Sequence, residues 1–315
     1  MLLFLCFACS NDFGLASVTD PDLRDGTAPS GDLDGGGGET QDTALAEDTA
    51  AELEDTDVDA PVEEDTAVVV EADPAPAEDC DHTSDLVYVL SRDDSRLYTF
   101  DPSTLDFTSL GVLNCGTSQQ PGSMAVDRTG IAWVRYADDS LYEVELATLT
   151  CTQSTYSDRR TGFGSFGMGY ATDDAETWRD QLYVANANQL ATLDPATWTL
   201  STLGRLPSQS ELTGNADGEL WAMLPLENPA KLVELDKGDA SVLATISLPN
   251  FPNPSNIDAF AFATWNGAFY LFVREYGMGS STDVYEVTAI GKMSKVRGDI
   301  GFDVIGAGVS TCAPV

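Results

Sequence analysis

Three acidic residues of this sequence stand where a protein built of repeated strands could use them for acid–base chemistry. Glu211, Asp258 and Asp303 lie at or near the starts of apolar segments that read as inner strands. A glycoside hydrolase needs two carboxyl groups about 5–10 Å apart, one of them with a raised pKa. The sequence around these residues gives no sign of a raised pKa, and the segment 80–315 holds 30 acidic residues, so chance alone places some there. We therefore expect a protein that is not an enzyme and keep a hydrolase as an alternative.

Other kinds of chemistry have less support in the sequence. The single histidine, His82, excludes most histidine-based catalysis and most histidine-rich metal sites. The acidic stretch 32–59 lacks the ligand spacing of a calcium-binding loop. Residues 162–167 spell the dinucleotide fingerprint G-x-G-x-x-G, but the residues after it continue a strand, whereas the fingerprint must open a helix. We expect no metal and no cofactor, and we attribute these glycines to a close approach of strands.

A repeated segment of about nine residues organises the chain from residue 80 onward. Each copy alternates apolar and polar residues over five positions and then enters a turn, which is the pattern of a strand followed by a hairpin. The copies begin 44, 49, 42 and 52 residues apart. Four are clear and the fifth is weaker: Leu97–Leu105, Leu141–Leu149, Leu190–Trp198, Leu232–Ala240 and Val284–Thr288.

Further apolar segments predict additional strands around each copy. One strand precedes every copy, an inner strand lies before four of these, and outer strands follow several copies. Four-stranded units of about 40–50 residues are typical of β-propeller blades, and the 236 residues of 80–315 hold five of them. We predict an all-β fold, a single five-bladed propeller. Six or seven blades and a β-sandwich remain the alternatives.

The two ends of the repeat region complement each other. The first unit begins at its second strand, Leu86–Ser91, and lacks an inner strand, whereas Val304–Ser310 is a glycine-containing strand without a unit. Pairing the two closes the ring and removes exposed sheet edges. We therefore expect the C-terminal strand to complete the first blade.

The tryptophans fall into two groups. Trp178 lies in a polar insertion, 173–180, and is the aromatic residue that we select as the candidate for ligand contact. The other four alternate along strands and are expected to pack between blades: Trp133, Trp198, Trp221 and Trp265.

This organisation resembles extracytoplasmic propellers of the kelch, NHL and YVTN kinds and is similar to the propeller domains of acidic bacterial lipoproteins. The resemblance covers residues 80–315, and a fold shared by so many functions specifies none of them. In the absence of a catalytic motif we predict a binding or interaction module. A purely structural protein of the cell envelope is a further alternative.

The first nine residues resemble the signal peptide of bacterial lipoproteins. Leu2–Ala8 is an apolar run too short to span a membrane. It ends in a small residue before Cys9, as in the lipobox, although Cys6 stands where leucine is usual and no basic residue precedes the run. The resemblance implies export and lipidation at Cys9. The residues that follow lack the inner-membrane retention signal, which implies the outer membrane or the cell surface.

An acidic linker is expected between this anchor and the propeller. Residues 10–79 hold 22 acidic residues against one basic residue, Arg24, and such a segment cannot bury enough apolar surface to fold. The net charge of −37 argues against binding to nucleic acid or to anionic membrane surfaces. We expect a monomer that touches the membrane only through its lipid and that binds an unknown protein or glycan of the envelope.

The cysteines predict two disulfides. Four cysteines remain beyond Cys9, and an even number in an exported protein implies oxidised pairs with three possible connectivities. Ring closure places Cys80 and Cys312 at the same interrupted turn, which favours Cys80–Cys312 and leaves Cys115–Cys151. The second pair fits less well, because its cysteines are expected at opposite ends of their strands.

Overall fold

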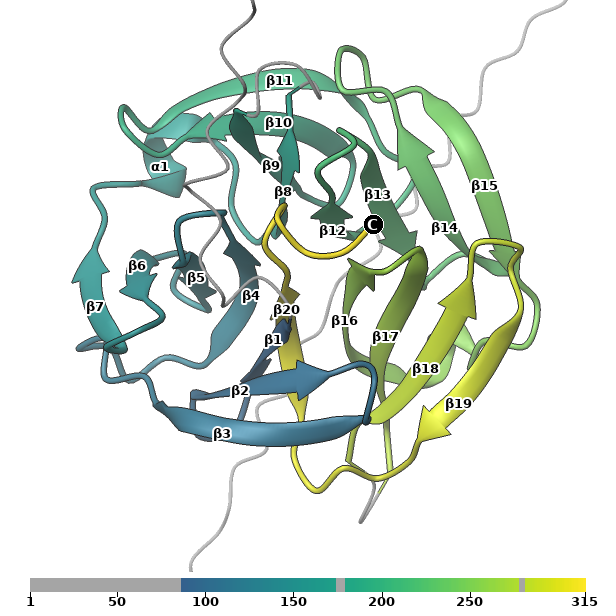
Figure 1. Cartoon of the computed structure of the whole chain (residues 1–315). Helices are drawn as coiled ribbons and strands as arrows, with labels where there is room; N and C mark the ends of the chain where they lie inside the picture. The colour runs from purple at the N-terminus through teal and green to yellow at the C-terminus, as the bar shows by residue number, and fades with distance from the viewer. Residues whose placement is uncertain (1–85, 174–178, 278–280) are drawn as a thin grey trace, which may run out of the picture. The chain divides into compact units, whose positions relative to one another are not determined.

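Five four-stranded antiparallel sheets surround a common axis, as Figure 1 shows in a view close to that axis. The computed structural model describes residues 86–173, 179–277 and 281–315. This arrangement confirms the all-β, five-bladed propeller. The expected lipid anchor at Cys9, the linker 10–79, Cys80 and Trp178 lie outside the described residues, so the predictions about them stay predictions.

Each blade runs from an inner strand at the axis to an outer strand at the rim. Blade 1 contains β20 (Val304–Gly308), β1 (Val87–Ser91), β2 (Arg96–Asp101) and β3 (Asp106–Val112). Blade 2 contains β4 (Pro121–Val126), β5 (Ile131–Tyr136), β6 (Leu141–Glu145) and β7 (Thr150–Gln153). Blade 3 contains β8 (Gly167–Thr172), β9 (Asp180–Ala185), β10 (Gln189–Asp194) and β11 (Thr199–Arg205).

The last two blades follow the same order. Blade 4 contains β12 (Glu211–Gly214), β13 (Leu220–Leu224), β14 (Ala230–Leu235) and β15 (Val242–Leu248). Blade 5 contains β16 (Ile257–Trp265), β17 (Ala268–Glu275), β18 (Asp283–Thr288) and β19 (Met293–Arg297). Helix in the described residues is limited to one short α1 (Asp158–Thr161) and a 3₁₀ turn at Pro254–Asn256.

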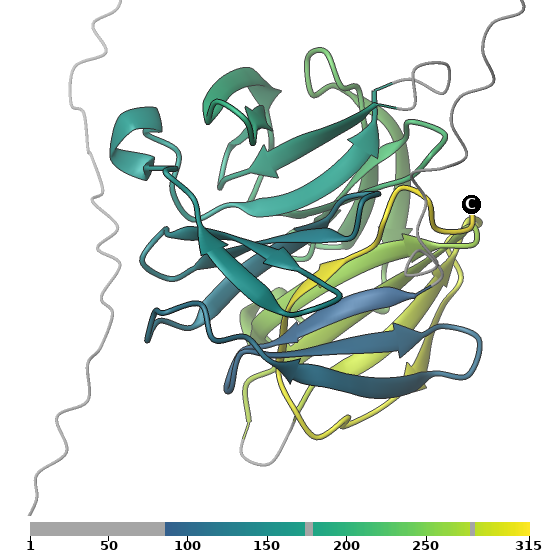
Figure 2. The ribbon, with the colours of Figure 1, turned by 60° about the vertical axis from the view of Figure 1, so that its left-hand side comes forward.

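The C-terminal strand closes the ring. β20 pairs antiparallel with β1, with Gly308 opposite Tyr88 and Gly306 opposite Leu90. In Figure 2 the yellow end of the chain accordingly lies among the strands of blade 1, drawn in blue. The predicted closure is therefore confirmed, and the first blade consists of strands from the two ends of the repeat region.

The repeated segment contains the turn between the third and fourth strands of a blade. This turn is of the same kind in each of the four clear copies. In blade 3 the backbone N–H of Trp198 donates to the carbonyl of Asp194 at 2.7 Å, and the Asp194 side chain accepts from the N–H of Ala196. The last residue of each of the four clear copies has positive φ, a conformation that the surrounding turn must enforce for a residue other than glycine. These residues are Leu105, Leu149, Trp198 and Ala240.

The hydrophobic core consists of five clusters, each between two neighbouring blades. The rings of Trp133 in blade 2 and Trp198 in blade 3 meet edge to face at 5.0 Å. Trp221 of blade 4 meets Phe269 of blade 5 in the same way at 4.9 Å. The expected packing of these tryptophans between blades is confirmed, and Trp265 packs against the cluster between blades 1 and 5.

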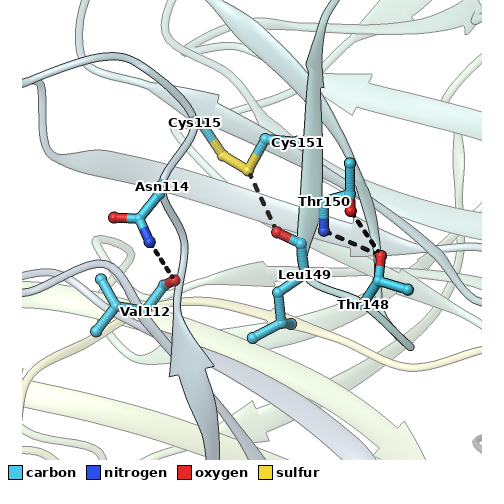
Figure 3. Close-up of a disulfide and its surroundings, with 7 residues drawn as sticks. All are labelled: Val112, Asn114, Cys115, Thr148, Leu149, Thr150 and Cys151. Carbon is cyan, nitrogen blue, oxygen red and sulfur yellow. Dashed lines mark hydrogen bonds between the residues drawn. A yellow bond between two sulfur atoms is a disulfide. The ribbon is translucent and has the colours of Figure 1, made fainter.

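A disulfide joins the edges of blades 1 and 2. Cys115 follows β3 on the segment that leads to blade 2, and Cys151 lies in the outer strand β7, with their α-carbons 5.0 Å apart. Figure 3 shows the bond between this connecting segment and the neighbouring strand. The predicted Cys115–Cys151 pair is confirmed. The two cysteines meet because the segment between the blades carries Cys115 past its own strand to β7.

The inner strands pack backbone against backbone at the axis. A Cβ atom on Gly169 of β8 would lie 2.7 Å from the carbonyl oxygen of Leu212 in β12, and one on Gly308 of β20 would lie 2.9 Å from Val126 in β4. Such contacts leave no room for a side chain. The close approach of strands that we predicted for the fingerprint glycines is confirmed at Gly167, where a Cβ atom would collide with the carbonyl oxygen of Ser210. It was wrong for Gly162, which ends α1 with positive φ and has nothing within 4 Å of its Cβ position, and for Gly164, which faces the side chain of Asp139. Residues at equivalent positions of neighbouring inner strands are in contact. The inner strands therefore run in the same direction, and all of them begin at the same end of the axis.

Replacement of Gly169 by alanine tests this packing. We expect Gly169→Ala to lower the free energy of unfolding by about 1–3 kcal/mol, because the added methyl group must push two backbones apart. The matched control is Gly238→Ala, in an exposed turn where the nearest atom is a side-chain oxygen at 3.1 Å; its effect should stay within about 0.5 kcal/mol. Equal urea-denaturation midpoints for the two variants would contradict the packing.

Candidate functional site

The axis is filled in the middle and has a cavity at the end where the inner strands begin. Its centre has a cavity volume of 0 Å³. At the far end the guanidinium group of Arg128 bonds Asp180 at 2.6 Å, and the hydroxyl group of Thr311 donates to the same carboxylate at 2.8 Å. This buried ion pair links blades 2 and 3 to the segment after β20. At the other end of the axis, where the inner strands begin, the ring has an opening.

A cavity of about 180 Å³ lies at that opening. Blades 1, 2, 4 and 5 contribute to its wall, mostly through the first residues of their inner strands. Gln209 and Leu226 are exposed at its rim, and Phe260 is half-buried. The lining residues are Gly122, Gln209, Glu211, Leu226, Ile257, Asp258, Ala259, Phe260 and Ile305.

Glu211, the first residue of β12, is the buried acid of this cavity, with 7% of its surface exposed. The hydroxyl group of Ser123 donates to its Oε2 at 2.8 Å, and that hydroxyl accepts from the backbone N–H of Met168 at 3.1 Å. These bonds join inner strands of blades 2, 3 and 4. Burial raises the pKa of Glu211 to about 8, although the Ser123 hydrogen bond and the charge of Arg135 act in the opposite direction.

Asp258 and Asp303 belong to a cluster of four charged residues beside the cavity. Arg92, which follows β1, donates to Asp258 at 2.8 Å and to Asp303 at 3.0 Å. Arg274 of β17 also pairs with both carboxylates. All four side chains are at most 20% exposed. Each carboxylate thus has two guanidinium partners, and its charge is compensated within the protein.

The structure brings the three acidic residues selected from the sequence to one end of the propeller but gives them different surroundings. Glu211 and Asp258 line the same cavity. Asp303 is not among the lining residues and is connected to Asp258 by the two arginines that pair with both carboxylates. The sequence around Glu211 gives no sign of its raised pKa, because its burial depends on contacts from three blades. Sequence reasoning also missed Ser123 and the two arginines, which carry no motif of their own.

A second cavity, of about 240 Å³, lies at the opposite ends of blades 4 and 5. Its carboxylate Glu219 accepts hydrogen bonds from the side chains of Asn215 and Trp221, at 2.9 and 3.1 Å. These three polar groups bond one another, and Asp217 also lines the cavity. The axial cavity differs in that four blades form its wall and a buried carboxyl group lies in it. We therefore assign the candidate site to the axial cavity.

Within residues 86–173, 179–277 and 281–315, no three His, Cys, Asp or Glu side chains are grouped closely enough to hold a metal ion. The same residues contain no helix with the length and apolar character needed to cross a membrane.

Neither a protein-family model nor a curated protein matches this sequence. Among solved structures, the chain is similar to a structural genomics protein of unknown function from Bacteroides thetaiotaomicron (TM-score 0.41, 15% identity, 70% of this chain and 57% of that chain). It is also similar to a luciferin-regenerating enzyme (TM-score 0.41, 14% identity, 70% of this chain and 92% of that chain). The chain spans little more than half of the first protein, and neither similarity transfers a function to it.

The burial of Glu211 predicts how stability depends on pH. The folded protein holds a proton on this carboxyl group up to a pH of about 8, whereas the unfolded chain releases it near 4.5, the ordinary pKa of a glutamate. The free energy of unfolding should therefore fall by several kcal/mol as the pH rises between these values. Glu211→Gln should remove most of this slope in urea denaturation, and the control Glu286→Gln on β18 should keep it. Identical slopes for wild type and Glu211→Gln would contradict a buried, neutral Glu211.

Proposed function

We propose that this chain is a binding module that holds a small polar ligand in the axial cavity. The observation that carries the proposal is the buried carboxyl group of Glu211 in the wall of the axial cavity. A volume of about 180 Å³ lies below the usual range of about 300–1,000 Å³ for ligand pockets, so the ligand or the bound part of a larger one is small.

A glycoside hydrolase is the second candidate, because Glu211 has the raised pKa of a general acid. Hydrolysis also needs a carboxylate that is free to act as a base or nucleophile. Asp258, the other carboxylate of the cavity, is held in ion pairs by Arg92 and Arg274, so its oxygens are already engaged. The cavity therefore has an acid but lacks a free base, which favours binding over catalysis.

Filling the cavity tests the proposed function. We expect a ligand found by saturation-transfer NMR with a library of small polar metabolites to lose its signal with Leu226→Trp, because the larger ring occupies the cavity rim. Leu243→Trp is the matched control, since Leu243 is 59% exposed on β15 and lies away from the cavity lining. A ligand whose signal survives Leu226→Trp binds elsewhere and overturns the proposed site.

The binding module is further proposed to be exported and tethered to the outer membrane through a lipid on Cys9 and the acidic linker 10–79. The support is the apolar run before Cys9 and the charge of the linker. Cys9→Ser should move the protein from the membrane fraction to the soluble fraction after cell lysis, because one residue carries the entire anchor. Equal partitioning of the two proteins would refute the lipid anchor.

A further inference from the structure

The hydrogen bonds around Glu211 show where its proton resides. A serine hydroxyl group has one hydrogen to donate. Ser123 accepts from the N–H of Met168 at its oxygen and gives its hydrogen to Oε2 of Glu211. With Ser123 as the donor, Oε2 is the acceptor, and a proton on Oε1 completes the neutral acid. Glu211 thus has an O–H group that is not used by Ser123 and that can serve a ligand.

Charges around the cavity disfavour ionic ligands. The lining residues include no Lys, Arg or His, so an anion would meet the carboxylate of Asp258 without a cation in the wall. A cation would gain little from Asp258, whose charge is already balanced by Arg92 and Arg274. A charged ligand would also leave its hydration shell without a partner of opposite sign. An uncharged ligand avoids both costs.

The remaining lining groups suit hydroxyl groups. The amide of Gln209 both donates and accepts, and Glu211 adds a donor. Phe260 and Ile305 provide half-buried apolar surface on which the C–H face of a ring can rest. Donors and acceptors beside an apolar wall, in a volume of about 180 Å³, match a single sugar ring or a polyol.

We propose that the axial cavity selects an uncharged, hydroxyl-rich ligand, such as one neutral sugar unit, and that the protonated Glu211 donates a hydrogen bond to it. This inference rests on the proposed binding function. It makes Glu211 the residue that determines specificity, and it predicts that binding is lost when Glu211 ionises.

Few other groups around Glu211 can contribute to a pH dependence. Strand β5 contributes Arg135, which bonds the backbone carbonyls of Phe166 and Tyr136 and pairs with Asp139. Strand β16 contributes Asp258, already paired with arginines. Strands β4 and β13 carry no ionisable side chain, and β8 carries only Tyr170, whose pKa burial raises well above its ordinary value. Glu211 is thus the group expected to titrate in this region between pH 6.5 and pH 9.

The test uses the full chain and a panel of methyl glycosides, N-acetylglucosamine and mannitol, with glucuronate and glucosamine as charged counterparts. We expect at least one neutral member to bind at pH 6.5, measured by saturation-transfer NMR and titration. Its apparent Kd should rise about tenfold at pH 9, because only about a tenth of Glu211 is then protonated. The charged counterparts should bind more weakly or not at all.

Two variants separate a hydrogen-bonding role of Glu211 from a structural one. Glu211→Gln keeps a donor and should bind the neutral probe with a Kd that is the same at pH 6.5 and pH 9. Glu211→Ala removes the donor and should abolish binding at both values. Each variant is used only if its circular dichroism and thermal unfolding show a folded protein, and Glu211→Gln carries the test if Glu211→Ala does not fold.

The possible failures are distinguishable. A charged metabolite from the library that binds and is displaced by Leu226→Trp would overturn this inference and leave the proposed binding function intact. A neutral probe whose Kd changes equally with pH in wild type and Glu211→Gln would overturn the role of Glu211. Absence of binding by the whole panel would overturn the ligand class, and absence of any ligand sensitive to Leu226→Trp would overturn the proposed function as well.

Discussion

Direct backbone packing of five inner strands around the axis is the constraint on which the rest of this structure depends. Glycine is required where β8 meets β12 and where β20 meets β4, because a Cβ atom at Gly169 or Gly308 would collide with the neighbouring strand. The packing needs a complete ring, which β20 provides by pairing with β1. It also fills the centre of the axis, and the axial cavity lies at the end where the strands begin.

The same packing explains the unusual state of Glu211. A Cβ atom on Gly167 would lie 2.9 Å from the carboxyl carbon of Glu211. The backbone of β8 therefore packs directly against the Glu211 carboxyl group, with no side chain between them. Ser123 reaches it from blade 2, and no cation among the described residues forms an ion pair with it. A carboxyl group in such surroundings keeps its proton near neutral pH. The two aspartates beside it have arginine partners, and this difference in surroundings is the basis of the proposed binding of a neutral ligand.

The sequence and the structure agree wherever one segment alone determines the outcome. The repeats that end at Leu105, Leu149, Trp198 and Ala240 predict the blades, because each holds its own strand and turn. Closure by Val304–Ser310 follows from counting strands. The chemistry of the site depends instead on contacts between distant segments. Arg92 and Arg274 lie in different blades, and nothing near either residue indicates that both bind Asp258 and Asp303. The burial of Glu211 likewise requires three blades in place.

A direct measurement of the Glu211 pKa tests the central claim, that axial packing keeps this acid neutral beside a binding cavity. Carboxyl ¹³C NMR of glutamate-labelled protein can follow its titration, with the resonance assigned by its absence from Glu211→Gln. The account predicts a titration midpoint of about 8 for this one resonance. A midpoint near 4.5, the value of an exposed glutamate, would contradict it.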